Sequence, residues 1–149
     1  MSLNEQITEA LKLAMKAKDQ AGLRALRAIK AELLLLKTKE GGGEISAEDE
    51  LGSLVKMAKQ RRDSISIFRE QNREDLAVKE EEELVVIEQF LPKQMSRDEL
   101  ETEISKIIQE VGASSMKDMG RVMGVASGKL KGRADGKLIS EVVKQLLSK

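Results

Sequence analysis

Glycine and basic residues alternate near the end of this chain in a pattern that could meet phosphate. Five glycines stand at every fourth position: Gly120, Gly124, Gly128, Gly132 and Gly136. The basic residues interleaved with them are Lys117, Arg121, Lys129, Lys131, Arg133 and Lys137. Glycine allows another backbone to approach closely, and lysine and arginine attract anions. The pattern therefore predicts a close-approach surface for a polyanion or for a neighbouring helix.

The local structure expected to carry these glycines is a helix. Apolar residues recur at helical spacing over residues 116–131, so Gly120, Gly124 and Gly128 should lie nearly on one face. Each glycine costs roughly 1 kcal/mol relative to alanine inside a helix. Either close packing against a helix of the same protein or a phosphate chain near the backbone would explain that cost. The residues alone leave both interpretations open.

Catalysis by a serine nucleophile is not supported, although Ser114, Ser115 and Lys117 superficially match the Ser-Ser-Lys set of amidases. Amidase chemistry brings these groups together from separate chain segments and adds a glycine-rich oxyanion hole. Ser115 is better suited to cap the helix that follows it. The chain also lacks histidine and cysteine, which removes the usual general base and thiolate chemistry. We therefore predict no catalytic residue and no enzymatic activity.

Two further motifs fail as phosphate or metal sites. The segment 124–129 has three residues between its glycines where a P-loop has four, and no Ser or Thr follows its lysine. The acidic run 80–83 could suggest magnesium, but four consecutive helical residues point in four directions and cannot converge on one ion. A solvated helix face is the better interpretation of that run. No cofactor and no metal are predicted.

The composition indicates an all-α protein. Phe68 and Phe90 are the only aromatic residues, Pro92 is the only proline, and 35% of the residues are charged. A core of Leu, Ile, Val, Ala and Met with few helix breakers is typical of long helices. With 149 residues the chain can form one ordinary domain or two small ones.

Helical stripes and capping signals divide the chain into two domains at residues 91–96, because the residue before Pro92 avoids the α region. About four helices are expected over residues 1–91, with turns near Gly22, at the triple glycine 41–43 and at Asn72. Three shorter helices are expected over residues 92–149. Their end signals are the Ser96–Glu99 capping box, Gly112, Ser115, Gly132 and Asp135.

The charge is unevenly distributed between these two parts. Residues 1–92 hold 15 basic and 18 acidic residues, whereas residues 93–149 hold 11 basic and 8 acidic ones. A polyanion should therefore meet the C-terminal part first. The start of the sequence has no basic and apolar leader, and no apolar run is long enough to span a membrane. These features predict a cytoplasmic protein without a membrane partner.

Three segments carry a specific resemblance to a known family. They are Phe90-Leu-Pro-Lys-Gln-Met95, the stretch 110–124, and Lys131-Gly-Arg-Ala-Asp-Gly-Lys-Leu-Ile-Ser140. The chain resembles the YqeY family of small bacterial proteins over essentially its whole length. From about Leu91 onward it is also similar to the tail domain of the B subunit of the tRNA-dependent glutamyl and aspartyl amidotransferase. The resemblance implies a helical N-terminal domain joined to a three-helix module.

The same resemblance implies tRNA or another structured RNA as the partner. In the amidotransferase, the tail engages the tRNA body while a separate cradle domain performs the amide transfer. This chain resembles the tail and has no counterpart of the cradle. A label of carbon-nitrogen ligase with glutamine as amido donor would therefore be inherited by homology, and we expect a noncatalytic accessory module.

The predicted RNA-binding residues are Arg121, Lys129, Lys131, Arg133 and Lys137. Because almost no aromatic side chains are available to stack on bases, recognition would go through phosphates and shape rather than through base sequence. The alternative is a protein-protein interaction module, in which a partner helix docks on the glycine-bearing helix face. The sequence does not distinguish which RNA or protein is bound, the biological process, the oligomeric state or the relative motion of the two domains.

Overall fold

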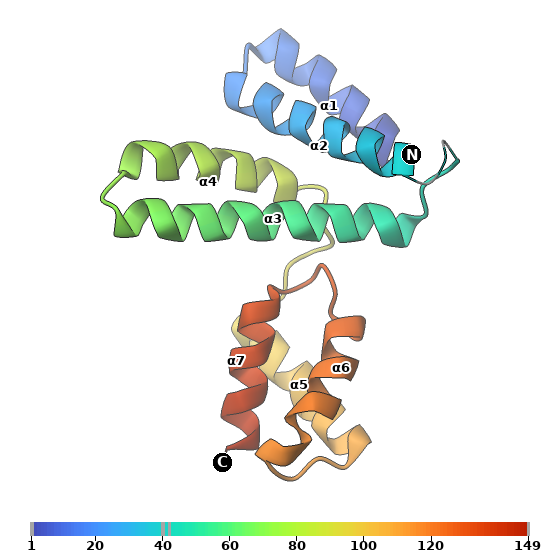
Figure 1. Cartoon of the computed structure of the whole chain (residues 1–149), viewed down its shortest axis with the longest axis vertical. Coiled ribbons are helices and arrows are strands. Elements are labelled where there is room, and N and C mark those ends of the chain that lie inside the picture. The colour runs from blue at the N-terminus through green and yellow to red at the C-terminus, as the bar shows by residue number, and fades with distance from the viewer. Residues whose placement is uncertain (1, 40, 42, 149) are drawn as a thin grey trace. The chain divides into compact units, whose positions relative to one another are not determined.

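The computed structural model describes residues 2–39, 41 and 43–148. Within these ranges the protein consists of seven α-helices and one short 3₁₀ helix, with no strand (Figure 1), which confirms the predicted all-α class. The chain divides into two compact units, Met1–Leu91 and Pro92–Lys149, which we call the N-terminal unit and the C-terminal unit. Each unit has a hydrophobic core of its own.

The N-terminal unit is built from two helical hairpins. The first pairs α1 (Leu3–Ala17) with α2 (Gln20–Lys39), and the second pairs α3 (Ala47–Glu70) with α4 (Glu74–Glu88) (Figure 1). The hairpins meet where α2 packs against α3 and α4. Apolar residues that return every three or four positions give each helix one buried side. The predicted N-terminal bundle of about four helices is therefore confirmed.

The connection between α2 and α3 contains the triple glycine 41–43. Gly42 lies outside the described residues, and Gly41 has a left-handed backbone with a φ of 74°. At the end of this connection the Ser46 hydroxyl accepts a hydrogen bond from the Asp49 N–H at 3.1 Å. This bond satisfies one of the free N–H groups at the start of α3.

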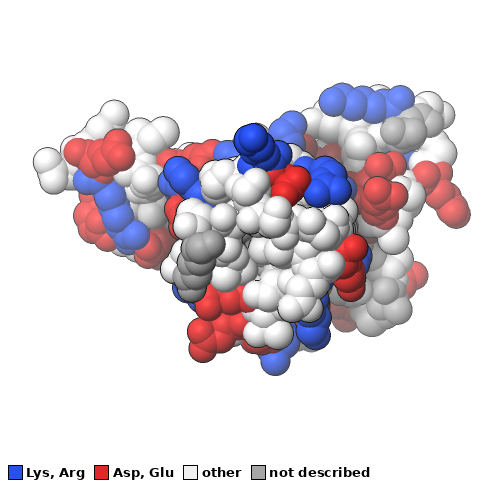
Figure 2. All heavy atoms as spheres, turned by 90° about the horizontal axis from the view of Figure 1, so that it is seen from below, with Lys and Arg blue, Asp and Glu red and all other residues white. Residues whose placement is uncertain are grey.

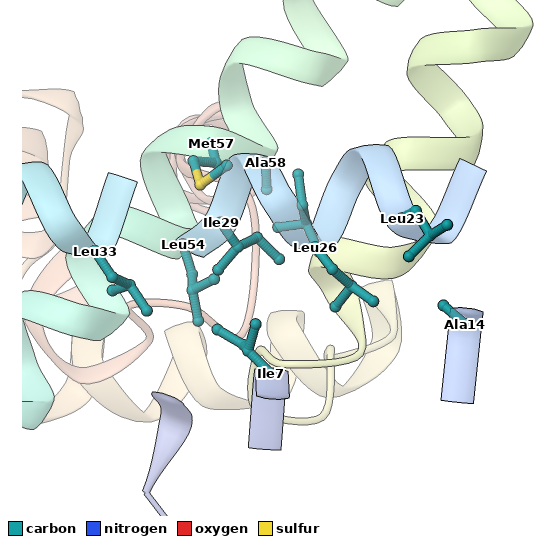
Figure 3. Close-up of a cluster of buried hydrophobic side chains, with 10 residues drawn as sticks. Ile7, Ala14, Leu23, Leu26, Ile29, Leu33, Leu54, Met57 and Ala58 are labelled. Atoms are coloured by element: carbon teal, nitrogen blue, oxygen red, sulfur yellow. The ribbon is translucent and has the colours of Figure 1, made fainter. Parts of the chain in front are cut away.

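The core of the N-terminal unit is centred on one side of α2. Figure 3 shows its residues meeting Ile7 of α1 and, on α3, Leu54 and its neighbours. The buried residues of this core are Ile7, Ala14, Leu23, Leu26, Ile29, Leu33, Leu54, Met57, Ala58 and Ile87. All of them are aliphatic or sulfur-containing, as the composition predicts.

The acidic run on α4 pairs with arginines of neighbouring helices, so the predicted solvated face is wrong. Arg61 of α3 is central, because its side chain is only 18% exposed and its Nε lies 3.5 Å from Glu80 and 3.7 Å from Glu83. Four consecutive side chains point in four directions and thus reach different partners on α2 and α3. The pairs are Glu80 and Glu83 with Arg61, Glu81 with Arg69, and Glu82 with Arg24.

The C-terminal unit contains three α-helices, as predicted. They are α5 (Arg97–Val111), α6 (Met119–Lys129) and α7 (Gly136–Leu147), and a 3₁₀ helix, η1 (Met116–Asp118), precedes α6. The single α-helix predicted over residues 116–131 is wrong at both ends. At its start, a carboxylate oxygen of Asp118 accepts hydrogen bonds from the Ser114 and Ser115 N–H groups at 2.9 and 3.4 Å, which closes a tighter turn. At its end, the chain leaves the helix after Lys129.

Capping signals at the other ends in this unit have mixed outcomes. Ser96 and Glu99 form the predicted reciprocal capping box, and Gly112 ends α5 with a left-handed φ of 69°. Asp135 is the N-cap residue of α7 but its side chain makes no capping hydrogen bond. Gly132 has a φ of 80° and lies in the turn after α6 rather than at the helix end.

The core of the C-terminal unit is entirely aliphatic. Its buried residues are Leu100, Ile104, Ile107, Val122, Ala126, Leu130, Ile139, Val142, Val143 and Leu147. The two phenylalanines precede Pro92, so the C-terminal unit has no aromatic ring. Across the described part of the chain, no helix is both long and apolar enough to cross a bilayer.

Candidate functional site

The glycines of α6 form an open face. Gly120, Gly124 and Gly128 are exposed, and no described atom comes within 4 Å of a Cβ placed on any of them. The same holds for Gly136 in the first turn of α7. Close packing against a helix of this unit therefore does not explain these four glycines. Their approach by an external partner stays a prediction.

Gly132 differs from the other four glycines. It is buried, and its φ of 80° lies in the left-handed region that side chains other than glycine rarely adopt. Its carbonyl oxygen accepts a hydrogen bond from the Gln94 side-chain amide at 2.6 Å. The role of Gly132 is thus to shape the backbone between α6 and α7.

Three of the predicted cations lie together around this turn, which we call the α6–α7 turn (residues 130–136). Lys131 and Lys137 are exposed, Arg133 is half-buried, and none of the three forms an ion pair with a residue that the structure describes. The chain direction reverses here, so residues on both sides of the turn are brought to one end of the unit (Figure 1). The result is a small cationic surface.

The other two predicted cations are engaged elsewhere. Lys129 is exposed and its Nζ lies 2.9 Å from a carboxylate oxygen of Glu110 on α5. Arg121 lies two helical turns earlier, and one of its guanidinium nitrogens is 3.0 Å from Asp118. Hydrogen bonds from the Ser114 N–H and from Arg121 hold the pKa of Asp118 below its usual value. The structure therefore does not gather all five cations at one point.

The serines near this site serve the backbone. The Ser114 and Ser115 N–H groups bind Asp118, and Lys117 is an exposed residue of η1. Nothing in this geometry brings a lysine to a serine hydroxyl for nucleophilic attack. Among the described residues, no group of three carboxylates could hold a metal ion.

The opposite end of the C-terminal unit has a different surface. Figure 2 looks onto the end where α5 and α7 stop, and its surface consists mainly of uncharged atoms with basic and acidic groups along the margin. The α6–α7 turn lies at the other end of these helices (Figure 1). Sequence analysis placed the cations correctly in one stretch, but it did not reveal that Gln94 contacts that stretch. That contact spans 38 residues and has no local signal.

The fold and the site define an all-helical protein with a cationic turn in a small three-helix unit. A family model described as Yqey-like protein matches residues 4–147, and the chain belongs to this family. Two curated relatives are named "Altered inheritance of mitochondria protein 41, mitochondrial". The protein from Vanderwaltozyma polyspora is 36% identical over 73% of this chain and 62% of its own length. The protein from Pyrenophora tritici-repentis is 31% identical over 92% of this chain and 76% of its own length.

A shorter likeness links the chain to a tRNA-dependent enzyme. One component of the glutamyl-tRNA(Gln) amidotransferase from Thermococcus gammatolerans is 42% identical over 55 residues, which cover 34% of this chain and 9% of that component. Its counterpart from Aeropyrum pernix is 39% identical over 61 residues, or 38% of this chain and 10% of the counterpart. These matches confirm the resemblance to amidotransferase components.

Two sequence-based expectations, the compartment and the lack of catalysis, are affected by these relatives. The names of the two mitochondrial proteins contradict the predicted cytoplasmic localisation, and a bacterial origin gains no support from them. Charge and the lack of a membrane span do not distinguish one aqueous compartment from another, which is why that prediction was wrong. The names of the family and of these two relatives indicate no catalytic role, in agreement with the prediction that the chain is not an enzyme.

Proposed function

We propose that this chain is a noncatalytic accessory protein whose C-terminal unit binds tRNA or a similarly structured RNA through phosphate and shape contacts. The observation that carries the proposal is the α6–α7 turn. Lys131, Arg133 and Lys137 hold their charges there without an ion-pair partner among the described residues. Unpaired cations are available to replace the counterions of an RNA backbone.

The backbone around the turn also suits an anion. Gly136 is exposed in the first turn of α7, where free N–H groups and the helix dipole give a partial positive charge. The unit has no aromatic ring that could stack on a splayed base. Binding would therefore depend on the placement of phosphates in a folded RNA and little on base identity.

The comparisons support RNA as the partner class. The amidotransferase components described above act, by their name, on glutamyl-tRNA, and the segments they share with this chain are about as long as the C-terminal unit. That part of a tRNA-dependent enzyme is what this chain would retain. The amide-transfer chemistry would belong to the rest of those enzymes.

Charge reversal in the turn tests this proposal. The variant Lys131→Glu/Lys137→Glu should bind unfractionated tRNA at least roughly tenfold more weakly, and its plot of log Kd against log salt should lose a slope of about two. The measurement is fluorescence anisotropy with labelled tRNA over a salt series. Helix content by circular dichroism should not change, because both side chains are exposed.

The matched control is Lys12→Glu/Lys16→Glu on α1, which reverses the same charge on the N-terminal unit. Equal tRNA affinity of the turn variant and the wild type would refute the proposal. Equal losses in both double variants would show that only net charge matters, and they would refute a site at the turn.

A protein partner is the second candidate function, favoured by one observation. The open space over Gly120, Gly124 and Gly128 would let a partner helix approach the α6 backbone closely. In this case Gly124→Leu should remove proteins captured from a lysate that persist after nuclease treatment. Because the space is open, the substitution should leave the unit folded, as circular dichroism would show.

A further inference from the structure

The segment that leads into α5 is fastened to the α6–α7 turn. We call residues 92–96 the entry segment. The Gln94 side-chain amide donates to the carbonyl oxygen of Gly132 at 2.6 Å and to that of Pro92 at 3.0 Å. The next residue, Met95, donates its backbone N–H to the carbonyl oxygen of Arg133 at 2.8 Å. Two consecutive residues of the entry segment thus hold two consecutive carbonyls of the turn.

This attachment matters because the turn lies outside a regular helix. Within the turn, the Arg133 N–H donates to the carbonyl oxygen of Leu130 at 2.9 Å, and Gly132 adopts its left-handed conformation. The neighbouring carbonyls have no helical partner, so the entry segment supplies one for each. Lys131 and Arg133 flank Gly132, and their backbone positions are therefore set by Gln94 and Met95. Fixing charged groups before binding lowers the entropy lost when a ligand binds.

The entry segment also brings a cation of its own. Lys93 is exposed and, among the described residues, has no ion-pair partner. Hydrogen bonds from Ser96 are the main cause of the lowered pKa of Glu99, and the charges of Lys93 and Arg133 lower it further. Lys93 and Arg133 therefore lie near the same carboxylate. This places Lys93 beside the cationic turn, although almost 40 residues separate them in the sequence.

We propose that the entry segment is part of the RNA-binding surface, with Lys93 as a further phosphate-binding residue and Gln94 as the positioning residue of the α6–α7 turn. This inference rests on the proposed function and extends it to a segment that sequence analysis did not include. The surface then combines Lys93 with Lys131, Arg133 and Lys137. Gln94 carries no charge and acts through the backbone of the turn.

Neutralising Lys93 tests its role in binding. The variant Lys93→Gln should weaken tRNA binding by roughly three- to tenfold at low salt and reduce the salt slope by about one, as the loss of one phosphate contact requires. The control Lys144→Gln removes an equally exposed charge in the last turn of α7, away from the α6–α7 turn. It should change the affinity less than twofold. Equal effects of both variants would overturn the role of Lys93.

A double-mutant cycle tests the positioning role of Gln94. Gln94→Leu removes the donor and keeps a similar volume, and it should weaken tRNA binding about three- to tenfold while leaving the salt slope unchanged, because no charge is lost. In a Lys131→Gln background the same substitution should have less than half of that effect on the logarithm of Kd, since the residue it positions is neutral. An additive cycle would overturn the positioning role. Gln109→Leu, an exposed site on α5, is the control and should bind as the wild type does.

The results separate this inference from the proposed function. If wild-type protein does not bind tRNA, the proposed function fails and this inference fails with it. If the Lys131→Glu/Lys137→Glu variant loses binding while Lys93→Gln and Gln94→Leu bind like the wild type, the turn is the site and the entry segment has no part in it. Should Gln94→Leu unfold the unit, Lys93→Gln decides alone, because it leaves every hydrogen bond of the entry segment intact.

Discussion

At the scale of single residues, the five glycines of the C-terminal unit have two physical roles. Gly132 is buried with a φ of 80°, whereas Gly124 lies in regular helix with open space around the position of a Cβ. An L-residue in the left-handed region costs roughly 1–2 kcal/mol. A glycine in a helix interior costs about 1 kcal/mol relative to alanine. The same substitution should therefore have opposite effects at these two positions.

We expect Gly132→Ala to lower the free energy of unfolding by about 1–2 kcal/mol and Gly124→Ala to raise it by up to about 1 kcal/mol. Urea unfolding followed by circular dichroism measures both, and each variant serves as the control for the other. Destabilisation by Gly124→Ala would mean that the open face of α6 is occupied in the folded protein in solution, for instance by a second copy of the chain.

The residue types predicted the cationic site only in part. Lys131, Arg133 and Lys137 come together because they are close in the sequence and flank one turn. Lys129 and Arg121 have carboxylate partners, and such pairs depend on which helix faces which. Long-range contacts such as that of Gln94 with Gly132 leave no periodic pattern, since one amide and one carbonyl suffice for them.

At the scale of helices, the arginines of α2 and α3 hold the acidic side of α4. Arg61 is the most enclosed member of this set, and it faces two carboxylates that are 25% and 16% exposed. Its Nε makes no hydrogen bond to the described residues despite these short distances, so its interaction with them is mainly electrostatic. Removal of one partner of a poorly hydrated pair leaves the other charge uncompensated.

The variant Arg61→Met should therefore destabilise the N-terminal unit by about 1–3 kcal/mol, through unpaired carboxylates rather than lost volume. The control Lys12→Met breaks a pair with Glu9 in which both side chains are about 60% exposed, and it should cost less than about 1 kcal/mol. Thermal unfolding at low and at high salt measures the difference. A cost that is equal for both variants would show that Arg61 contributes no more than a surface charge.

Helix number and class were predictable from sequence because periodicity and capping are local properties. The Ser96–Glu99 box and the Gly112 terminator were both found as predicted. The start of α6 was not, because the Asp118 side chain captures two preceding N–H groups and favours a 3₁₀ turn. The solvated-face interpretation of residues 80–83 failed for a related reason, as partners on other helices are invisible in a single helical pattern.

At the scale of the whole molecule, the chain has two separate hydrophobic cores, one in each unit. A unit with its own core can fold without the rest of the chain, although one as small as residues 92–149 is at the lower limit of size for independent stability. We expect the fragment 92–149 to show the circular dichroism of a helical protein and a cooperative thermal transition. It should also bind tRNA within about threefold of the full chain, because the proposed contacts lie within it.

The complementary fragment, residues 1–91, is the control and should be helical without binding tRNA. A helical fragment 92–149 that fails to bind, together with a full chain that does bind, would mean that the N-terminal unit supplies part of the RNA surface. A disordered fragment would show that the second core depends on the first.

The aliphatic core of the C-terminal unit has a practical optical consequence. Because this unit contains no aromatic ring and the whole chain lacks tryptophan and tyrosine, the protein is nearly silent in near-ultraviolet absorbance and fluorescence. A single tryptophan introduced at the exposed Met116 would be its main fluorophore, and its emission would report on this unit alone, without an extrinsic dye.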